Sequence, residues 1–274
     1  MQQLERKYVQ TGVFKTHYRE AGSGAPLILI HGGGPGADSY GNWKDCFPTF
    51  ASQFHVYAYD MVGFGFSEAP DPAHFEYSMD ARSQQLIDFI KALGLDKGGV
   101  NLIGNSMGGA TALGVAIKEP ALVRNMVLMG SAGLTTALSP EIARLVHYDF
   151  TLEGMRGIST ALAYPGFKVS EEFVKYRHEL TLKDDIRRAT AAIQAWVKNH
   201  GGLWYDEADV AKVKTRTLVF HGKNDKVVQV PTAYKFLDLL ENSHGYILPK
   251  CGHWAMLEHP QVFTRVCMGF LSDN

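Results

Sequence analysis

Residues 101–117, NLIGNSMGGATALGVAI, run from an apolar, strand-like segment through a glycine-flanked serine into a segment with helical spacing. The centre of this stretch has the pattern G-x-S-x-G, with Ser106 between Gly104 and Gly108. Between a strand and a helix, this pattern forms a sharp turn that raises the serine hydroxyl above the edge of a sheet, and a Cβ on either side would clash. The pattern alone is common, but its setting predicts that Ser106 is a nucleophile rather than an incidental turn serine.

A serine hydroxyl needs an adjacent base, and the base needs an acid that orients it. Asp225 follows the apolar run TLVFHG, and His253 follows the run ending in LPK. Taken alone, Asp225 would serve equally well as a loop cap, and His253 as one of 11 unremarkable histidines. Their order after Ser106 and their shared position at strand ends predict a triad in which Asp225 orients His253, the acid and base.

The glycine cluster HGGGPG, residues 31–36, directly follows the apolar run PLILI. Acyl chemistry creates an oxyanion, which backbone N–H groups stabilise, and glycines let the backbone approach it. We expect one donor at Met107 and the other at Gly33. Gly32 and Gly34 are the alternatives for the second donor, and we expect them to line the substrate site. A phosphate-binding role is disfavoured because the loop lacks the pattern G-x-x-x-x-G-K-[ST].

Metal and nucleotide motifs are incomplete in this sequence. GFGFSE at 63–68 lacks the third glycine of a dinucleotide fingerprint, and His178-Glu179 is followed by Leu182 where a zinc-binding helix requires a second histidine. We therefore expect neither a cofactor nor a metal.

Apolar runs alternate with helical patterns on both sides of the serine. Runs of this kind are typical of strands buried on both faces, so we predict an α/β fold with a mostly parallel sheet flanked by helices. Two antiparallel strands within 7–24, with a turn at 22–24, come first. The other expected strands are 26–30, 54–60, 99–104, 123–130, 215–222 and 244–250, and the expected helices are 79–93, 107–118, 231–241 and 257–271.

The alternation stops at 134–207, where no strand-like run occurs. Ser139-Pro140 and Ser170-Glu171 predict two helix starts, and 181–199 predict a third helix that ends at Gly201. Open α/β sheets bind ligands at their strand ends. We therefore expect 134–207 to form a helical lid over a core made of 1–133 and 208–274.

Composition excludes several classes of function. The 274 residues carry 27 Lys and Arg against 28 Asp and Glu with no block of like charge, which disfavours a nucleic-acid or membrane-surface partner. No signal-peptide pattern is visible, and no apolar run reaches the roughly 18 residues of a membrane span. Three cysteines suit a reducing compartment, so we expect a cytoplasmic protein. No subunit interface is readable, which leaves a homodimer or higher homo-oligomer open.

Four segments together resemble the meta-cleavage product hydrolases of the α/β-hydrolase superfamily. The likeness covers essentially the whole chain, is weaker in the expected lid, and is nearest to the hydrolases of biphenyl, carbazole and dibenzofuran/dioxin pathways. It implies an α/β-hydrolase fold and cofactor-free hydrolysis of a carbon–carbon bond. The implied substrate is a 2-hydroxy-6-oxo-6-arylhexa-2,4-dienoate, cleaved to 2-hydroxypenta-2,4-dienoate and a benzoate-type acid. The segments are HGGGPGA, GNSMGGATALG, GKNDKVV and CGHWAMLEHP.

The resemblance also points to residues that would hold the carboxylate and 2-oxo end of such a substrate: Asn42, Asn105 and Arg177. Asn42 could instead cap a helix, and Asn105 could stabilise the turn. Arg177 falls on one helical stripe with Phe173 and Leu180, which favours an inward guanidinium over a side chain that merely covers apolar surface. A guanidinium suits a bidentate hold on a carboxylate.

Three further residues lie near the expected site. Trp254 resembles a pocket-lining residue of the family, although a packing aromatic would look the same. Leu162, in the expected lid, is a candidate contact for the aryl group. Cys251, two residues before His253, could be a thiol nucleophile, but a buried structural cysteine is the better interpretation.

Two other functions remain open on this pattern. A carboxylesterase would use the same triad and oxyanion donors, but it would gain nothing from Arg177, Asn42 and Asn105. A non-catalytic relative that binds a small molecule is disfavoured by the intact triad. Haloalkane dehalogenase chemistry is disfavoured because its nucleophile is a carboxylate, whereas Ser106 is a hydroxyl.

Overall fold

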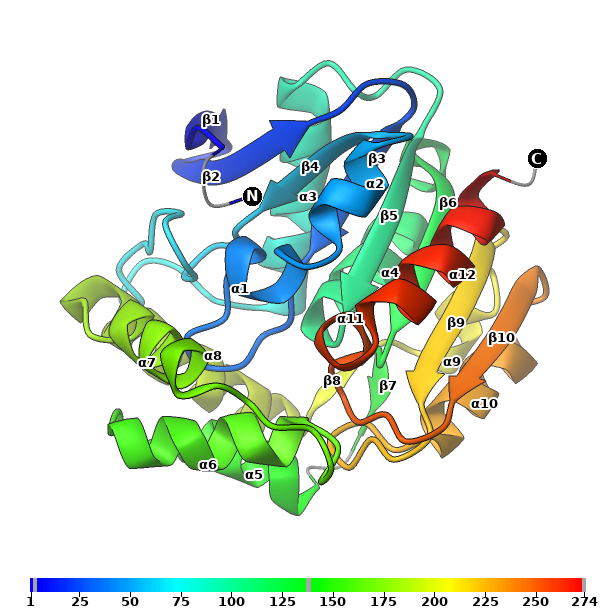
Figure 1. The fold of residues 1–274 in the computed structure, drawn as a ribbon. Coiled ribbons are helices and arrows are strands. Elements are labelled where there is room, and N and C mark those ends of the chain that lie inside the picture. Colours follow the sequence, from blue (N-terminus) through cyan, green and yellow to red (C-terminus); the bar gives the residue numbers. More distant parts are fainter. Residues whose placement is uncertain (2–3, 137–138, 273–274) are drawn as a thin grey trace.

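The computed structural model describes residues 1, 4–136 and 139–272, which build an eight-stranded sheet of order β1-β2-β4-β3-β5-β6-β9-β10 (Figure 1). The strands from β4 to β10 in this order run parallel, whereas β2 is antiparallel to both of its neighbours. The predicted α/β fold with a mostly parallel sheet is confirmed. The strands are β1 Lys7–Thr11, β2 Phe14–Ala21, β3 Pro26–Ile30, β4 His55–Tyr59, β5 Val100–Asn105, β6 Val123–Met129, β9 Arg216–Gly222 and β10 Ser243–Leu248.

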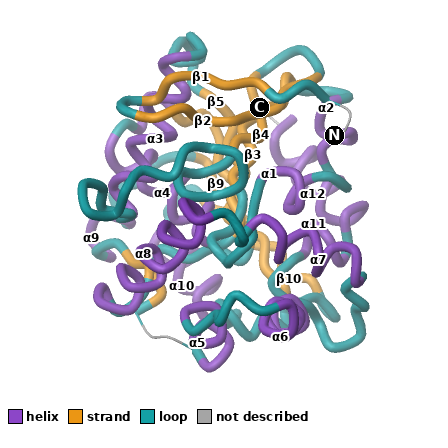
Figure 2. Tube along the Cα trace, turned by 90° about the vertical axis from the view of Figure 1, so that its left-hand side faces the viewer, coloured by secondary structure: helices purple, strands orange, loops and turns teal. Residues whose placement is uncertain are grey.

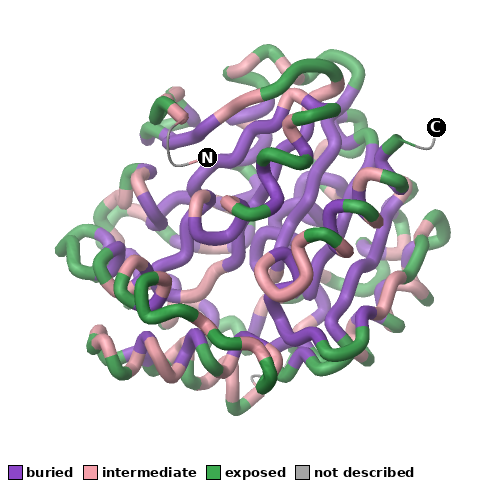
Figure 3. The backbone as a smooth tube through the Cα atoms, viewed as in Figure 1, coloured by how far each residue is buried: buried purple, intermediate pink, exposed green. Residues whose placement is uncertain are grey.

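The continuous apolar runs are explained by burial on both faces of the sheet. In β3, Leu27 and Leu29 belong to the core cluster on one face, while Ile28 and Ile30 belong to the cluster on the other, and all four are 0% exposed. Successive side chains of a strand point to opposite faces, so a strand covered on both sides is apolar throughout. Figure 3 shows the resulting buried centre beneath a more exposed outer layer.

Helices cover both faces. Residues of α3 Met79–Ala92, α4 Met107–Lys118, α9 Glu207–Val210 and α10 Pro231–Leu239 join one core cluster. Residues of α1 Ser39–Trp43, α2 Phe47–Ala51, α11 Ala255–Glu258 and α12 Pro260–Ser272 join the other. The single helix expected at 257–271 is wrong, since Pro260 starts a new helix and cannot continue the previous one. The short α1 and α2 were not predicted.

The turn of the first hairpin differs from the prediction. β1 and β2 are joined at residues 12 and 13, where Gly12 has φ +57°, whereas 22–24 connect β2 to the parallel part of the sheet. Both places carry glycines with positive φ, so the local turn signal does not distinguish a hairpin from a connection.

Between β6 and the short α9, the described residues form four helices: α5 Pro140–Val146, α6 Leu152–Leu162, α7 Glu171–Leu180 and α8 Asp184–His200. Ser139 and Ser170 cap α5 and α7 as expected, and α8 ends at Gly201, which has φ 73°. α6 was not predicted. Figures 1 and 2 place α5 and α6 at the end of the molecule opposite the β1–β2 hairpin, beyond the carboxyl ends of the parallel strands.

A small antiparallel ribbon, β7 Leu134–Thr135 and β8 Leu203–Trp204, joins the two ends of the helical segment. The sequence predicted no strand there, and that prediction is wrong. Two residues are too few to show the alternation by which a strand is recognised. Within the described ranges, no helix combines the length and apolar character needed to cross a membrane.

Candidate active site

Ser106 occupies the turn between β5 and α4 with φ 55° and ψ −117°, a conformation uncommon outside glycine. Its N–H donates to Met129 O at 3.0 Å. A Cβ on Gly104 would lie 2.3 Å from Gly108 O, and a Cβ on Gly108 would lie 2.4 Å from Ile30 O. The two glycines therefore allow the close packing that fixes this strained turn.

Asp225 and His253 meet at the carboxyl edge of the sheet, both buried. Nδ1 of His253 lies 2.7 Å from Oδ2 of Asp225. Because a carboxylate can only accept, Nδ1 carries the proton and Nε2 is left for another partner. The other carboxylate oxygen, Oδ1, accepts from the N–H groups of Val227 and Val228 at 2.8 and 3.0 Å. Asp225 is thus both a loop cap and the partner of His253.

The loop after β3 packs against the serine turn. A Cβ on Gly33 would lie 2.3–2.8 Å from three side-chain atoms of Met107, and a Cβ on Gly32 would lie 3.6 Å from Cβ of Ser106. Gly34 lines the cavity next to them. The backbone of this loop and the start of α4 therefore lie side by side at Ser106, the arrangement that two oxyanion donors require.

His31 holds this loop from behind. Its Nδ1 lies 2.6 Å from Gly32 O, and its Nε2 lies 2.9 Å from the N–H of Met61. An N–H can only donate, so Nε2 is unprotonated and Nδ1 donates to the loop carbonyl. Burial lowers the pKa of His31, which keeps this neutral form.

One end of the cavity, which we call the polar lobe, is lined by Asn42, Asn105, Ser106, Arg177, His253 and Trp254. Nδ2 of Asn105 donates to Met129 O at 3.2 Å, and Oδ1 of Asn105 accepts from Nδ2 of Asn42 at 3.2 Å. The bond to Met129 O fixes the orientation of the Asn105 amide, and the bond to Asn105 then fixes that of the Asn42 amide. Oδ1 of Asn42 is therefore the acceptor that remains for a ligand. The alternative in which Asn42 caps the helix that follows is wrong, because Asn42 lies within α1, which Asp38 caps, and Cys46 precedes α2.

Arg177 reaches the polar lobe from α7 and is only 2% exposed. Nη2 donates to Pro35 O at 2.6 Å, and Nε has no partner. The guanidinium lies 5.2 Å from the ring centre of Trp254 and 5.8 Å from that of Phe173. Burial lowers its pKa to about 10, so Arg177 is still charged at neutral pH and is a buried group with unused donors.

Leu162 and Cys251 flank the histidine loop. Leu162 is buried at the polar lobe, and its carbonyl accepts from the N–H of His253 at 2.9 Å. Cys251 is fully buried, and burial raises the pKa of its thiol, which disfavours a thiolate nucleophile. Its sulfur lies 3.6 Å from Gly252 O.

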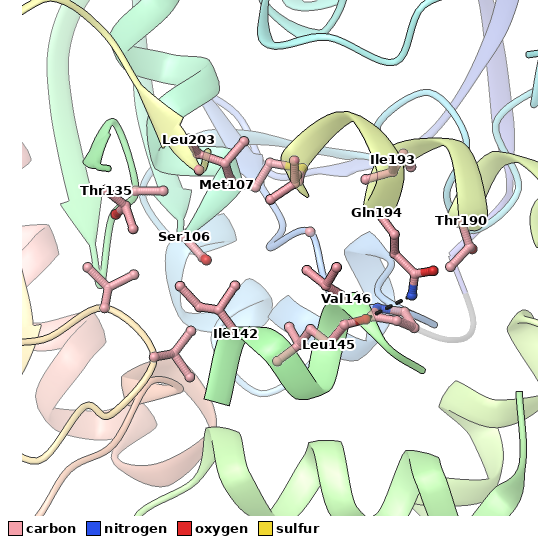
Figure 4. A pocket seen from close by; sticks show the side chains of 18 of the residues that line it. Ser106, Met107, Thr135, Ile142, Leu145, Val146, Thr190, Ile193, Gln194 and Leu203 are labelled. Atoms are coloured by element: carbon pink, nitrogen blue, oxygen red, sulfur yellow. Dashed lines mark hydrogen bonds between the residues drawn. The ribbon is translucent and has the colours of Figure 1, made fainter. Parts of the chain in front are cut away.

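On the other side of Ser106 lies what we call the apolar lobe, shown in Figure 4. Its walls include Ile142, Leu145 and Val146 of α5, Ile193 and Val197 of α8, and Leu203 of β8. Among the described residues, the polar side chains that line it besides Ser106 are Thr135, Thr190 and Gln194. An elongated ligand with one charged end and one apolar end would therefore span Ser106.

Comparisons with known proteins agree with this geometry. The family model described as the alpha/beta hydrolase fold matches residues 25–260. A 2-hydroxy-6-oxo-6-(2'-aminophenyl)hexa-2,4-dienoic acid hydrolase of Metapseudomonas resinovorans is 48% identical over 97% of this chain and 90% of its own length. The chain belongs to the meta-cleavage product hydrolases of the α/β-hydrolase family. The resemblance expected from the four sequence segments is thereby confirmed.

Solved structures place the hydrolase in the same group. The crystal structure of a serine hydrolase involved in carbazole degradation, the CarC enzyme, is 46% identical with a TM-score of 0.90, over 99% of this chain and 100% of that one. The 2-hydroxy-6-oxo-6-phenylhexa-2,4-dienoate hydrolase BphD from Rhodococcus sp. strain RHA1 is 29% identical with a TM-score of 0.90, over 98% of this chain and 99% of that one.

Several residues that build the hydrolase site were missed by sequence reasoning. Asp38 accepts from the N–H of Gly41 at 2.7 Å and from the hydroxyl of Tyr176, which joins α1 to α7. Glu258 accepts from the N–H groups of Gly252 and Trp254 at 2.8 and 3.0 Å, on both sides of His253. An aspartate before a helix signals a cap, but nothing in the sequence signals the long-range partners.

No group of three or more His, Cys, Asp or Glu side chains suited to a metal ion occurs among residues 1, 4–136 and 139–272 of the hydrolase. The residues that converge on Ser106 are donors, acceptors and apolar groups that suit hydrolysis by general acid–base chemistry.

Proposed function

We propose that this hydrolase cleaves the carbon–carbon bond of a 2-hydroxy-6-oxo-6-arylhexa-2,4-dienoate, releasing 2-hydroxypenta-2,4-dienoate and a benzoate-type acid. The observation that carries this proposal is the polarity of the cavity on the two sides of Ser106. A buried, charged Arg177 with unused donors lies on one side, and the apolar lobe lies on the other. The dienoate chain has a carboxylate at one end and an aryl ketone at the other.

In this reaction Ser106 is the nucleophile and His253, oriented by Asp225, is its base and later an acid. Nδ1–H of His253 is committed to Asp225, so Nε2 is the atom that takes the proton from the Ser106 hydroxyl. The N–H groups of Gly33 and Met107 stabilise the oxyanion on the ketone oxygen, and each such donor contributes about 3 kcal/mol to the transition state.

The polar lobe makes the departing carbon fragment stable enough to leave. Arg177 holds the carboxylate, and Oδ1 of Asn42 accepts from the 2-hydroxyl, aided by Asn105. Moving that hydroxyl proton to C5 gives the 2-oxo form. When the C5–C6 bond breaks, its electron pair is delocalised onto the C2 oxygen. The water that ends the cycle supplies OH to the acyl carbon and a proton to the dienolate, so atoms and charge balance.

We also propose that residues 134–207 act as a lid over this cavity and that 1–133 with 208–274 form the core. α5 and α8 supply the walls of the apolar lobe, and α7 supplies Arg177, while both catalytic loops come from the rest of the chain. We assign the protein to the cytoplasm, because its three cysteines are all unpaired and buried.

Arg177→Ala tests the substrate assignment. It should lower kcat/KM for the 6-phenyl dienoate, followed by loss of its visible absorbance, on the order of a hundredfold, because a buried charged hydrogen bond to the carboxylate is lost. Hydrolysis of a nitrophenyl acetate, which has no carboxylate, should change by less than about threefold. Arg144→Ala, an exposed arginine on α5, is the matched control.

Equal losses on both substrates would remove Arg177 from the substrate site. Rapid ester hydrolysis by the unmodified protein with no loss of dienoate absorbance would favour a carboxylesterase. Ser106→Ala should abolish both reactions.

A further inference from the structure

The apolar lobe ends in two polar side chains on one face of α8. Thr190 and Gln194 are four residues apart, so they lie one helical turn from each other, and both line the lobe. Figure 4 places both of them across the cavity from Ser106 and Thr135. A ligand with an unsubstituted, purely apolar ring in this lobe would offer neither side chain a hydrogen-bond partner.

The orientation of the Gln194 amide is set by α5. Its nitrogen, Nε2, lies 2.8 Å from Leu145 O. Leu145 is the next-to-last residue of α5, so its carbonyl has no partner within the helix. A carbonyl oxygen only accepts, so the amide must present its nitrogen there, and Oε1 is the atom left. No donor from the described ranges reaches Oε1 within hydrogen-bond distance, so Gln194 offers an acceptor.

We propose that Gln194, assisted by Thr190, selects aryl rings that carry a hydrogen-bond donor at the edge remote from the cleaved bond, such as a 4-hydroxyl or 4-amino group. This inference rests on the proposed function, which puts the ketone carbon at Ser106 and the ring in the apolar lobe. Figure 4 shows Gln194 and Thr190 of α8 across the cavity from Ser106, so a ring attached next to Ser106 would direct its opposite edge toward α8. A donor there pairs with Oε1, whereas an acceptor-only group meets a like partial charge.

The test is the ratio of kcat/KM for the 6-(4-hydroxyphenyl) dienoate to that for the 6-phenyl dienoate. The ratio should exceed one in the unmodified hydrolase and fall roughly tenfold in Gln194→Met, which keeps the length of the side chain and removes the acceptor. Loss of the contact with Leu145 O affects both substrates and cancels in the ratio. Thr190→Val should lower the ratio less. Gln84→Met, at an exposed glutamine of α3, should leave it unchanged.

A ratio that Gln194→Met does not change overturns the inference, even if the phenyl dienoate is turned over well and the proposed function stands. A second measurement separates the two ideas: inhibition of nitrophenyl acetate hydrolysis by acetophenone and by 4-hydroxyacetophenone. The preference for the hydroxylated inhibitor should be lost in Gln194→Met whether or not the dienoate is cleaved. Equal inhibition by both compounds in the unmodified protein overturns the inference.

Discussion

At Gly33 a single added carbon would meet Met107, with Cε at 2.3 Å and Cβ at 2.8 Å. The methionine tip can move, but its Cβ is tied to the first turn of α4. We therefore expect Gly33→Ala to displace the loop amide from the oxyanion position. The predicted result is a fall in kcat on the order of a hundredfold for dienoate and ester alike, because both reactions pass through an oxyanion. Steady-state kinetics on the two substrates measures it.

Gly157→Ala is the matched control, because a Cβ there meets nothing within 4 Å in the interior of α6. Replacing this glycine should stabilise the protein by up to about 1 kcal/mol and leave kcat unchanged. A Gly33→Ala enzyme with unchanged kcat would show that the second donor is another amide of the loop.

At the residue scale, the sequence predicted where the site residues lie better than it predicted which residues they hydrogen-bond to. Ser106, Asp225 and His253 follow from strand ends, and the buried place of Arg177 follows from its helical stripe. The link from Asn42 to Asn105 joins residues 63 positions apart and leaves no local pattern. Such contacts are fixed only when the sheet assembles.

Between elements, one buried carboxylate connects the two helices that carry the polar lobe. Oδ1 of Asp38 caps α1, which carries Asn42, and Oδ2 accepts from the hydroxyl of Tyr176, which precedes Arg177 on α7. The glycine loop after β3 also packs closely against α7, because a Cβ on Gly36 would lie 2.1 Å from Arg177 O. Asp38 therefore positions both helices without lining the cavity itself.

Tyr176→Phe should loosen α7 relative to α1. We expect the KM for the dienoate to rise on the order of tenfold while kcat for the nitrophenyl ester stays within about twofold, because only the dienoate uses Arg177. The lost hydrogen bond to a carboxylate should also cost about 2 kcal/mol of stability. Tyr234→Phe, an exposed tyrosine on α10, controls for the loss of a hydroxyl. A loss of ester kcat equal to the dienoate loss would indicate general unfolding instead.

Element prediction succeeded where patterns are long. The buried strands and the capped helices α5 and α7 were predicted because apolar runs and Ser-Pro or Ser-Glu starts are local signals. The β7–β8 ribbon was missed because each strand has only two residues and because 134–135 pair with the distant 203–204, which leaves no local signal. The split at Pro260 was readable from the sequence, since proline favours the first turn of a helix.

At the scale of the whole molecule, buried titratable side chains extend from β2 toward the polar lobe. His17 of β2 contacts Asp60, and the charge of Asp60 acts on Asp38. Oδ2 of Asp60 lies 2.8 Å from Nδ1 of His17, and both side chains are 0% exposed. Burial would raise the pKa of Asp60, but the contacts with His17, together with His31 and the N–H of Ser39, outweigh burial and lower it. The opposite happens at Asp38, where burial and the charge of Asp60 raise the pKa to about 7, against the hydrogen bonds from Tyr176 and Gly41.

The raised pKa of Asp38 predicts a particular dependence of stability on pH. Its ordinary value is 3.8, so between pH 4 and pH 7 the Asp38 carboxyl binds more protons in the folded state than in the unfolded state, and its contribution to the free energy of unfolding falls as pH rises. Asp38→Asn cannot titrate and keeps the cap, so its stability relative to the unmodified protein should rise across this window by up to about 4 kcal/mol and level off above it. The pKa of Asp60, the neighbour whose charge acts on Asp38, is lowered from its ordinary 3.8, so Asp60 stays ionised across this window in both proteins and its own titration does not enter the difference. Urea unfolding at pH 4.5, 6 and 8 measures it, with the exposed Asp238→Asn as control. A difference that is flat with pH, or that falls, would mean that Asp38 is ionised throughout and that Arg19 or Arg177 stabilises it fully.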